Sequence, residues 1–306
     1  MNIVFFSTSA FSLPSFRAIS GFIKCVITKR ARPKGRGYML EDSEIKKAAL
    51  QMGIPVIEID SFKEPSIFQV HDFDPHLFVV VSFGLIIPKK ILDIPTIGSI
   101  NVHPSLLPVY RGPSPIQWAL LNGDNETGIT VIKMNEQMDA GDIIYQETVH
   151  IDENDNAATL SDRLSVRSGE VLPNIIDHIE KEGKITGRQQ DHRLATFTPL
   201  ITKEMGRINW QAGAREINNR IRAFFLWPVA YTYIDEKLMK IYTGQTDPYN
   251  SDSPPGTIID INKKGIYVST TDGTLIIIEL QMENKKKMDA YSFAIGYRNL
   301  MGKAFK

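Results

Sequence analysis

Short apolar runs recur along the first hundred residues, and amphipathic stretches separate them. The runs occupy residues 3–6, 25–28, 55–59, 77–81 and 98–102. The stretches between them, such as 12–22 and 42–53, have apolar residues at helical spacing. Strands that are apolar throughout and alternate with amphipathic helices are typical of a parallel sheet covered on both faces. The pattern therefore predicts the α/β class, with an N-terminal Rossmann-like, doubly wound domain.

The pattern changes in the second half of the chain. Residues 156–183 have apolar positions such as Leu160 and Leu164 at helical spacing and predict one long helix. We expect a kink at Pro173, because proline removes a helical hydrogen bond. Residues 183–206 lack periodic signals and indicate an extended linker.

The last hundred residues have a third pattern. A short helical segment at 214–225 precedes many short strand-like runs. Turn signals such as Lys264-Gly265 and Asp272-Gly273 separate the runs. Closely spaced short strands favour a small antiparallel barrel. We therefore expect an α/β domain, a linker and an OB-like C-terminal β-barrel, which would occupy residues 1–182, 183–206 and 207–306.

Composition is ordinary for a folded protein of two domains, with 306 residues, 42% hydrophobic and 23% charged. Lys and Arg together number 35, as do Asp and Glu, so the net charge is zero. The two signs are unevenly distributed, because the residues from Arg207 onward include 14 basic and 10 acidic side chains. The C-terminal region is therefore mildly basic, although the whole chain lacks the excess charge that would by itself indicate a nucleic-acid partner.

The single cysteine, Cys25, excludes an intramolecular disulfide and a zinc site built from several cysteines. It lies in an apolar run, so a buried strand residue is a simpler interpretation than a reactive thiol. No apolar run approaches the roughly 18 residues of a membrane span, and the first residues do not have the pattern of a signal peptide. We expect a cytoplasmic monomer that requires neither a membrane nor a metal ion.

Two polar side chains, Asn101 and His103, follow one of the apolar runs, with Val102 between them. Ligands collect at the carboxyl ends of parallel strands, and residues on alternate positions project to the same side. The amide can donate to an oxyanion, and the imidazole can carry a proton. A turn-capping role for Asn101 and a loop hydrogen bond for His103 are the alternative interpretation.

A carboxylate, Asp139, lies in the loop after the next strand-like run. It could hold His103 or accept a proton from an incoming nucleophile, or it could be an ordinary turn residue. Ser105 lies in a proline-flanked loop, a position that favours loop hydrogen bonding over nucleophilic attack. Asn, His and Asp without an activated Ser or Cys favour direct transfer of an acyl group to an amine through a tetrahedral intermediate.

Residues 101–144, NVHPSLLPVYRGPSPIQWALLNGDNETGITVIKMNEQMDAGDII, resemble the signature of the enzymes that use 10-formyltetrahydrofolate as a formyl donor. In that superfamily Asn-x-His precedes Ser-Leu-Leu-Pro-x-Tyr-Arg-Gly, and Asp-x-Gly follows. The resemblance implies that Asn101 and His103 stabilise an oxyanion and that Asp139 orients His103. It also implies folate contacts along two loops, at Ser105, Leu106, Leu107, Pro108, Phe83, Gly84 and Leu85.

Further segments resemble the methionyl-tRNA formyltransferases in particular. Residues 28–40, TKRARPKGRGYML, resemble the basic loop after their second strand, and residues 201–228 and 254–288 resemble the end of their linker and their OB-like barrel. The resemblance implies a formyltransferase catalytic domain, a tRNA-binding C-terminal domain and methionyl initiator tRNA as the acceptor. The implied tRNA contacts are Arg30, Arg32, Lys34, Arg36, Arg222, Lys285, Lys286 and Lys287, although any one of them alone is better explained as a solvated surface charge.

Three other functions are compatible with parts of the pattern. Amino-sugar nucleotide formyltransferases share the signature, but the basic loop and the barrel argue against a small acceptor. A folate-sensing or RNA-binding protein without turnover would not need Asn101, His103 and Asp139 intact. A Rossmann dehydrogenase is disfavoured, because no G-x-G-x-x-G follows the first strand.

Overall fold

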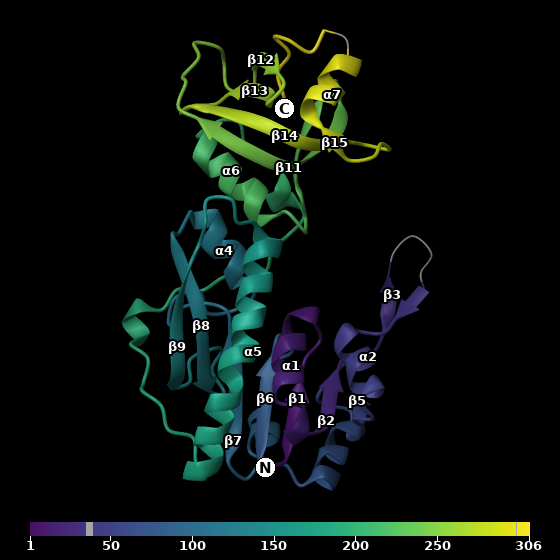
Figure 1. Ribbon diagram of the computed structural model, residues 1–306, viewed down its shortest axis with the longest axis vertical. Helices are drawn as coiled ribbons and strands as arrows, with labels where there is room; N and C mark the ends of the chain where they lie inside the picture. The colour runs from purple at the N-terminus through teal and green to yellow at the C-terminus, as the bar shows by residue number, and fades with distance from the viewer. Residues whose placement is uncertain (35–38, 298) are drawn as a thin grey trace. The chain divides into compact units, whose positions relative to one another are not determined.

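A seven-stranded sheet organises the first part of the chain, with the strand order β5-β2-β1-β6-β7-β8-β9 (Figure 1). The computed structural model describes residues 1–34, 39–297 and 299–306. Five strands are parallel: β1 (Ile3–Phe6), β2 (Ile23–Thr28), β5 (Val56–Glu58), β6 (Leu77–Val81) and β7 (Gly98–His103). The two at one edge, β8 (Glu126–Lys133) and β9 (Ile143–His150), are antiparallel. The predicted parallel sheet is confirmed, with an antiparallel edge.

Helices cover both faces of this sheet. Neighbouring residues of a strand point to opposite faces, and in β1 all of them are apolar and buried, so both faces are covered. On one face Phe5 packs edge-to-face against Phe16 of α1 (Leu13–Ala18), whereas Phe6 contacts Phe78 and Phe83 on the other face. In Figure 1, α2 (Glu44–Gln51) and α5 (Ala157–Glu182) lie on the same face as α1. The opposite face is covered by η3 (Pro65–Phe73) and α3 (Lys89–Leu92), whose buried residues join the core cluster of Phe6. The expected doubly wound architecture is confirmed.

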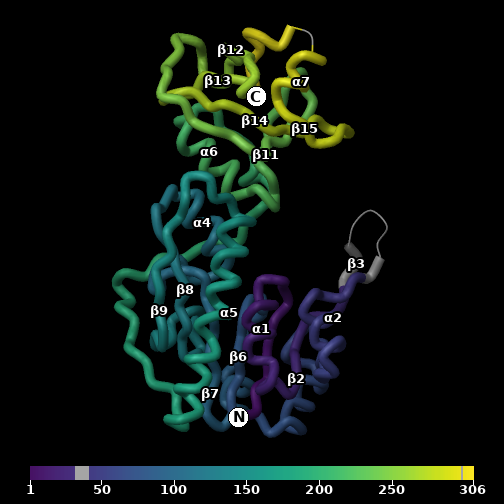
Figure 2. The backbone as a smooth tube through the Cα atoms, in the orientation of Figure 1, coloured from purple at the N-terminus to yellow at the C-terminus, as the bar shows by residue number. Residues whose placement is uncertain are grey.

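The remaining elements of the first two hundred residues are short. They are η1 (Ala10–Ser12), η2 (Ser20–Phe22), β3 (Arg32–Lys34), β4 (Met39–Glu41), α4 (Pro115–Asn122) and η4 (His192–Leu194). The backbone can be followed through them in Figure 2. The strands β3 and β4 pair with each other as an antiparallel ladder.

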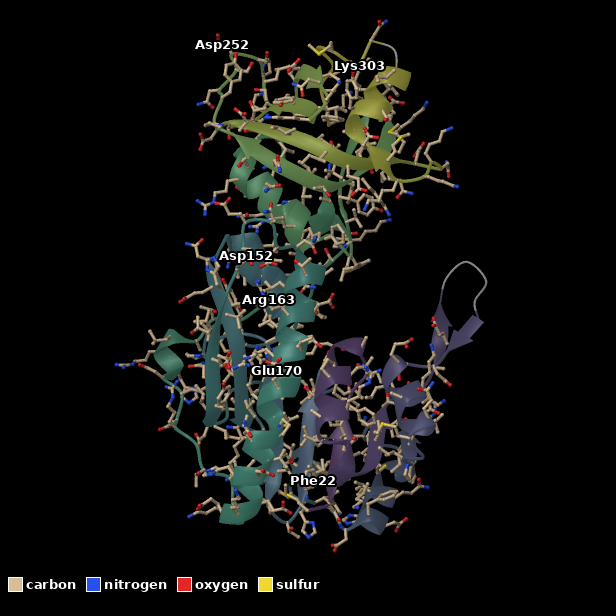
Figure 3. The ribbon with its side chains drawn as sticks, in the orientation of Figure 1. Phe22, Asp152, Arg163, Glu170, Asp252 and Lys303 are labelled. Atoms are coloured by element: carbon tan, nitrogen blue, oxygen red, sulfur yellow. The ribbon has the colours of Figure 1, made fainter. Side chains whose placement is uncertain are left out.

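The single long helix expected at 156–183 is observed as α5, and Pro173 lies inside it. Arg167 connects α5 to β9, because its guanidinium donates to Glu147 at 2.7 Å. It also donates to Glu170, one turn further along the helix and labelled in Figure 3. The kink at Pro173 stays a prediction.

Two compact units emerge from the contacts within the chain. One comprises Met1–Pro115, Glu126–His150 and Ser161–Thr198, and the other comprises Ile116–Asn125, Ile151–Leu160 and Pro199–Lys306. The irregular segment up to Thr198 thus belongs to the first unit. The boundaries predicted from the sequence, at 182 and 206, stay predictions.

The second unit contains a separate antiparallel sheet in the order β10-β11-β14-β13-β12, with β15 paired to β14. Its strands are β10 (Ala230–Ile234), β11 (Lys237–Asp247), β12 (Ile258–Asn262), β13 (Gly265–Ser269), β14 (Thr274–Met282) and β15 (Met288–Asp289). It also holds η5 (Glu204–Gly206), α6 (Ala214–Ala223) and α7 (Ala290–Gly296). The predicted C-terminal domain of short antiparallel strands is confirmed.

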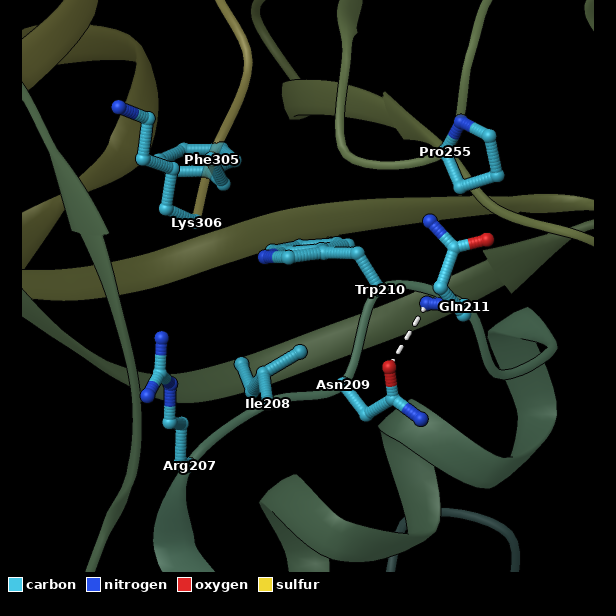
Figure 4. Close-up of a pocket in the computed structure, with 8 residues that line it drawn as sticks. All are labelled: Arg207, Ile208, Asn209, Trp210, Gln211, Pro255, Phe305 and Lys306. Carbon is cyan, nitrogen blue, oxygen red and sulfur yellow. Dashed lines mark hydrogen bonds between the residues drawn. The ribbon is translucent and has the colours of Figure 1, made fainter.

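Two aromatic side chains, Trp210 and Phe305, belong to the hydrophobic core of this second unit. Trp210 stacks on Phe305 with ring centroids 5.3 Å apart, beside a cavity of 390 Å³ that Arg207 and Gln211 help to line (Figure 4). The indole N–H of Trp210 donates to the hydroxyl of Thr232 at 2.9 Å, which satisfies a buried polar group. Over the described parts of the whole chain, no helix combines the length and the apolar character needed to cross a membrane.

Candidate active site

The strand β7 brings Asn101 and His103 to the same side of the sheet. Val102, between them, is 2% exposed and points to the other face of the sheet. His103 is itself buried, and it pairs in register with Thr130 of the antiparallel neighbour β8. The strand therefore presents an amide and an imidazole side by side at its carboxyl end.

The carboxylate of Asp139 contacts both of these side chains. Asn101 Nδ2 donates to Asp139 Oδ1 at 3.3 Å, and the backbone N–H of Gly112 donates to Oδ2 at 2.8 Å. His103 Nδ1 lies 3.6 Å from Oδ2, an ion-pair distance rather than a hydrogen bond. The structure thus brings together the three residues that the sequence singled out as catalytic, and their roles stay predictions.

The second ring nitrogen of His103 has a different partner. Nε2 lies 2.9 Å from the backbone carbonyl oxygen of Tyr110. A carbonyl oxygen only accepts, so Nε2 carries a hydrogen and Nδ1 is the nitrogen that faces Asp139. The imidazole of His103 therefore has a backbone carbonyl on one side and the Asp139 carboxylate on the other.

Buried hydrogen bonds hold the loop that contains residues 105–108. The Ser105 hydroxyl donates to the carbonyl of Val109 at 2.7 Å, and Thr130 Oγ1 donates to the carbonyl of Ser105 at 2.6 Å. Leu107 is 2% exposed, and its N–H donates to the same Thr130 hydroxyl at 3.1 Å. Ser105 and Leu107 therefore support the loop, whereas Leu106 and Pro108 are partly exposed.

The neighbouring loop, after β6, has the same division between supporting and exposed residues. Phe83 is 3% exposed and packs edge-to-face on Phe62 with ring centroids 5.9 Å apart. Gly84 is exposed, and its carbonyl accepts from Lys29 Nζ at 3.0 Å. Leu85 is partly buried, and Ile86 is 74% exposed. Of the predicted folate contacts in this loop, Gly84 and Leu85 are the accessible ones.

Among the predicted tRNA contacts of the basic loop, Arg30 is already paired with acidic side chains. Its guanidinium donates to Asp60 at 3.1 Å and to Glu64, and these hydrogen bonds raise its pKa. Arg32 and Lys34 form part of β3, and only their backbone is described. Arg36 lies outside the described residues.

The predicted contacts in the second unit differ in accessibility. Arg222 Nη1 donates to the backbone carbonyls of Asp152, Glu153 and Asp155, at 3.2 to 3.3 Å, so its guanidinium joins two segments of that unit. Burial lowers the pKa of Arg222. These hydrogen bonds give Arg222 a structural role within the unit, and its contact with tRNA stays a prediction.

The three lysines after β14 also differ in their contacts. Lys287 Nζ pairs with Glu279 at 2.8 Å and lies over the rings of Tyr242 and Phe225, at 4.5 and 5.4 Å from their centroids. Lys285 and Lys286 are exposed. Of the three, these two present their charges to solvent most fully.

Within residues 1–34, 39–297 and 299–306, no group of three His, Cys, Asp or Glu side chains could hold a metal ion.

Sequence reasoning missed several residues that hold the site in place. Thr130 and Gln190 are the clearest. Thr130 makes two hydrogen bonds to the loop of Ser105 and one to Gln146 of β9. Gln190 makes two hydrogen bonds to the loop of Asp139 and two to Arg111. Gln190 lies outside the signature segment, Thr130 lies within it at a position to which the sequence assigns no role, and their partners are distant in sequence. No periodic or compositional signal marks them.

The sheet order and the site correspond to a known class of enzyme. Residues 4–176 match the formyl transferase family, and residues 200–298 match the formyl transferase C-terminal domain. The fold, the site and these two matches together define a formyltransferase.

Relatives that match nearly the whole chain show which family of formyltransferases it belongs to. The methionyl-tRNA formyltransferase of Citrifermentans bemidjiense is 38% identical over 99% of this chain and 97% of its own. That of Thermodesulfovibrio yellowstonii is 41% identical over 96% of each chain. The chain belongs to the methionyl-tRNA formyltransferase family.

Solved structures share the fold at lower identity. An N-formyltransferase from Helicobacter canadensis, in complex with folinic acid and dTDP-3-aminofucose, has a TM-score of 0.67 at 19% identity, over 94% of this chain and 100% of that one. HypX from Aquifex aeolicus, in complex with tetrahydrofolic acid, has a TM-score of 0.64 at 16% identity. That match covers all of this chain and 51% of HypX, so this chain spans about half of its length. These likenesses concern the fold alone.

Proposed function

We propose that this chain transfers the formyl group of 10-formyltetrahydrofolate to the α-amino group of methionyl initiator tRNA, which gives N-formylmethionyl-tRNA for translation initiation. The observation that carries the proposal is the contact of Asp139 with both Asn101 and His103 at the end of β7. The full-length relatives named methionyl-tRNA formyltransferase support the choice of acceptor.

Charge develops on the formyl oxygen when the amine attacks the formyl carbon, and donors beside that carbon lower the barrier. Asn101 Nδ2 carries two hydrogens, and one of them is donated to Asp139. The second is directed to the formyl oxygen. His103 Nε2–H provides the other donor when the formyl oxygen replaces the Tyr110 carbonyl as its acceptor.

Protons and bonds balance in this reaction. The neutral amine nitrogen forms a bond to the formyl carbon, and the bond between that carbon and N10 of the folate breaks. The amine loses one proton, for which the Asp139 carboxylate is the base, through a water molecule. N10 gains one proton as it leaves. The carboxylate is therefore a proton carrier between two nitrogens, and no covalent enzyme intermediate forms.

The accessible residues beside Asn101 suit a pterin and its aminobenzoyl extension. Gly84, Leu85, Leu106 and Pro108 offer backbone groups and apolar surface on two loops that follow the adjacent strands β6 and β7. Ser105, Leu107 and Phe83 hold those loops in shape from the interior. The formyl donor would bind as a co-substrate along these loops.

The tRNA would be bound by backbone and shape contacts more than by its sequence. The basic loop with Arg30, Arg32, Lys34 and Arg36 and the exposed lysines of the second unit provide the charge. In this proposal residues 1–182 form the catalytic domain, 183–206 the linker and 207–306 the tRNA-binding domain. The protein would act as a cytoplasmic monomer without a metal ion.

A formylation assay with a labelled formyl donor tests the proposal. The acceptors are methionyl initiator tRNA, methionyl elongator tRNA and an amino-sugar nucleotide, assayed side by side. We expect label on the initiator tRNA, and label on the sugar nucleotide alone would overturn the acceptor.

Single substitutions test the catalytic roles. We expect Asn101→Ala and His103→Ala each to lower kcat by about 10² to 10³, the usual effect of removing an oxyanion donor. Asn174→Ala and His178→Ala change the same residue types at exposed positions of α5 and serve as controls. Wild-type turnover in either site variant would refute the assigned role.

A further inference from the structure

Gln190 lies in the irregular segment after α5, where the sequence indicated only a linker, yet its side chain is 4% exposed. Its Nε2 donates to the backbone carbonyl of Asp139 at 2.9 Å and to that of Gly141 at 2.7 Å. Its Oε1 accepts from Arg111 Nε and Nη2 at 3.2 and 2.6 Å. Both hydrogens and both lone pairs of the amide are therefore used.

The partners fix the orientation of this amide. Carbonyl oxygens only accept and a guanidinium only donates, so the reversed amide would lose all four hydrogen bonds. Only an amide can satisfy both sets of partners. A carboxylate would lose the two hydrogen bonds donated to the carbonyl oxygens, and an alkyl chain would lose all four hydrogen bonds. The requirement for glutamine at this position is thus chemical as well as steric.

The loop that Gln190 holds needs such support. Asp139 has φ = 49°, in the left-handed region that non-glycine residues rarely occupy. At Gly141 a side chain would collide with the carbonyl oxygen of Lys133, so the loop runs in close contact with β8. With its backbone held by Gln190, the Asp139 carboxylate meets Asn101 and the N–H of Gly112.

Arg111 completes the network as a buried cation. It is 4% exposed, and its guanidinium contacts Gln190 and Nδ1 of His192, the latter at 3.0 Å. Because arginine only donates, His192 Nδ1 is the acceptor in this hydrogen bond. Its backbone is also fixed, since Arg111 N–H donates to the carbonyl of Thr196 and Thr198 N–H donates to that of Arg111. The segment from 190 to 198 is therefore attached to the site at several points.

We propose that Gln190 is a positioning residue for formyl transfer, one that holds the backbone of Asp139 so that its carboxylate meets Asn101 and His103. The inference rests on the proposed function for its kinetic consequences. Its structural part, the support of the Asp139 loop, holds for any reaction at this site.

The variant Gln190→Glu tests this role most directly. Glutamate keeps an acceptor for Arg111 but replaces both amide donors with lone pairs directed at two carbonyl oxygens. We expect kcat to fall by about 10- to 100-fold, because displacements of about 1 Å have effects of this size. The KM values should change by less than about threefold, since the substrates are bound by other residues.

Two comparisons separate positioning from loss of folding. Gln189→Glu is the matched control, because it makes the same chemical change at the exposed neighbouring position and should leave kcat unchanged. In an Asp139→Asn background, Gln190→Glu should cause little further loss, because both changes act through one carboxylate. Independent, multiplicative losses in the double variant, or an unchanged kcat in Gln190→Glu, would overturn the proposal.

Hydrogen–deuterium exchange provides a readout that does not depend on activity. The Gly112 N–H donates to Asp139, so a peptide that contains Gly112 should exchange faster in Gln190→Glu than in the wild type or Gln189→Glu. Faster exchange in a protein that formylates no acceptor would refute the proposed function and keep the structural support. Unchanged exchange would refute the support itself.

Discussion

At the scale of single residues, one buried hydroxyl supports the loop that carries residues 105–108. Thr130 has no exposed surface, and its Oγ1 donates to the carbonyl of Ser105. It accepts from the N–H of Leu107 at 3.1 Å and from Gln146 Nε2 at 3.0 Å. One hydrogen and two lone pairs are the full capacity of a hydroxyl, so no water is needed to satisfy it.

Replacing this threonine by valine should destabilise the protein. The Thr130→Val variant has nearly the same shape but leaves the buried N–H of Leu107 without an acceptor. We expect a loss of about 1 to 3 kcal/mol in the free energy of unfolding, measured by urea denaturation, and a higher KM for the formyl donor. Thr130→Ser keeps the hydroxyl and should retain most of the stability. A valine variant as stable as the wild type would show that the loop relaxes without cost.

These residues also show what the sequence can reveal about the site. Asn101 and His103 could be predicted, because strand alternation places them on one side, and the motif extends to Asp139. Thr130 and Gln190 could not, because their partners are 16 to 79 positions away in the chain and are mostly backbone groups, with the side chains of Gln146 and the buried Arg111. Backbone acceptors have no sequence signature, and only the folded chain brings them to these side chains.

At the scale of elements, an ion pair anchors the strand β2 and its following basic loop to the start of η3. Arg30, two residues beyond β2, donates to Asp60 and Glu64. The Glu64 carboxylate also accepts from the backbone N–H groups of Asp60 and Ser61, at 2.7 and 3.0 Å. The hydrogen bond from Arg30, followed by that from Asp60, lowers the pKa of Glu64 to about 2.

This lowered pKa predicts a pH dependence of stability. The pKa of Glu64 is lower in the folded chain than the value of about 4.3 in an unfolded one, so its contribution is present above that value and is lost as the pH falls towards 2. The melting temperature of Glu64→Gln should therefore vary less with pH than that of the wild type between pH 5 and 2. The effect is small because the pair is at the surface. Glu126→Gln is a matched control at an exposed position, and a parallel change in all three proteins would contradict the prediction.

The pattern of apolar and polar residues predicts the regular helices and strands, and it gives no signal for the irregular segments. Parallel strands β1, β2, β6 and β7 were visible because they are apolar on both faces. The antiparallel direction of β8 was not, because direction depends on the length of the connection and on pairing partners. The segment from 190 to 198 has no periodic pattern, so its sequence indicates only a linker, and in the structure its hydrogen bonds go to loops.

At the scale of the whole molecule, a net charge of zero conceals an excess of four basic residues from Arg207 onward. Two of these basic side chains already have partners within the protein, since Arg222 donates to backbone carbonyls and Lys287 pairs with Glu279. Lys285 and Lys286 remain exposed between β14 and β15. If the second unit binds tRNA phosphates, these two lysines should contribute more than Arg222 or Lys287.

The charge-reversed double variant Lys285→Glu/Lys286→Glu tests this ranking. Binding of initiator tRNA should weaken, and the slope of log affinity against log salt should fall by about two, one for each lost phosphate contact. The kcat at saturating tRNA should stay near the wild-type value, because neither lysine belongs to the unit that contains Asn101, His103 and Asp139. Lys181→Glu/Lys184→Glu changes the net charge equally at exposed positions of the first unit and should leave the slope unchanged. Equal slopes for the two double variants would mean that the lysines act through overall charge and that the C-terminal contact lies elsewhere.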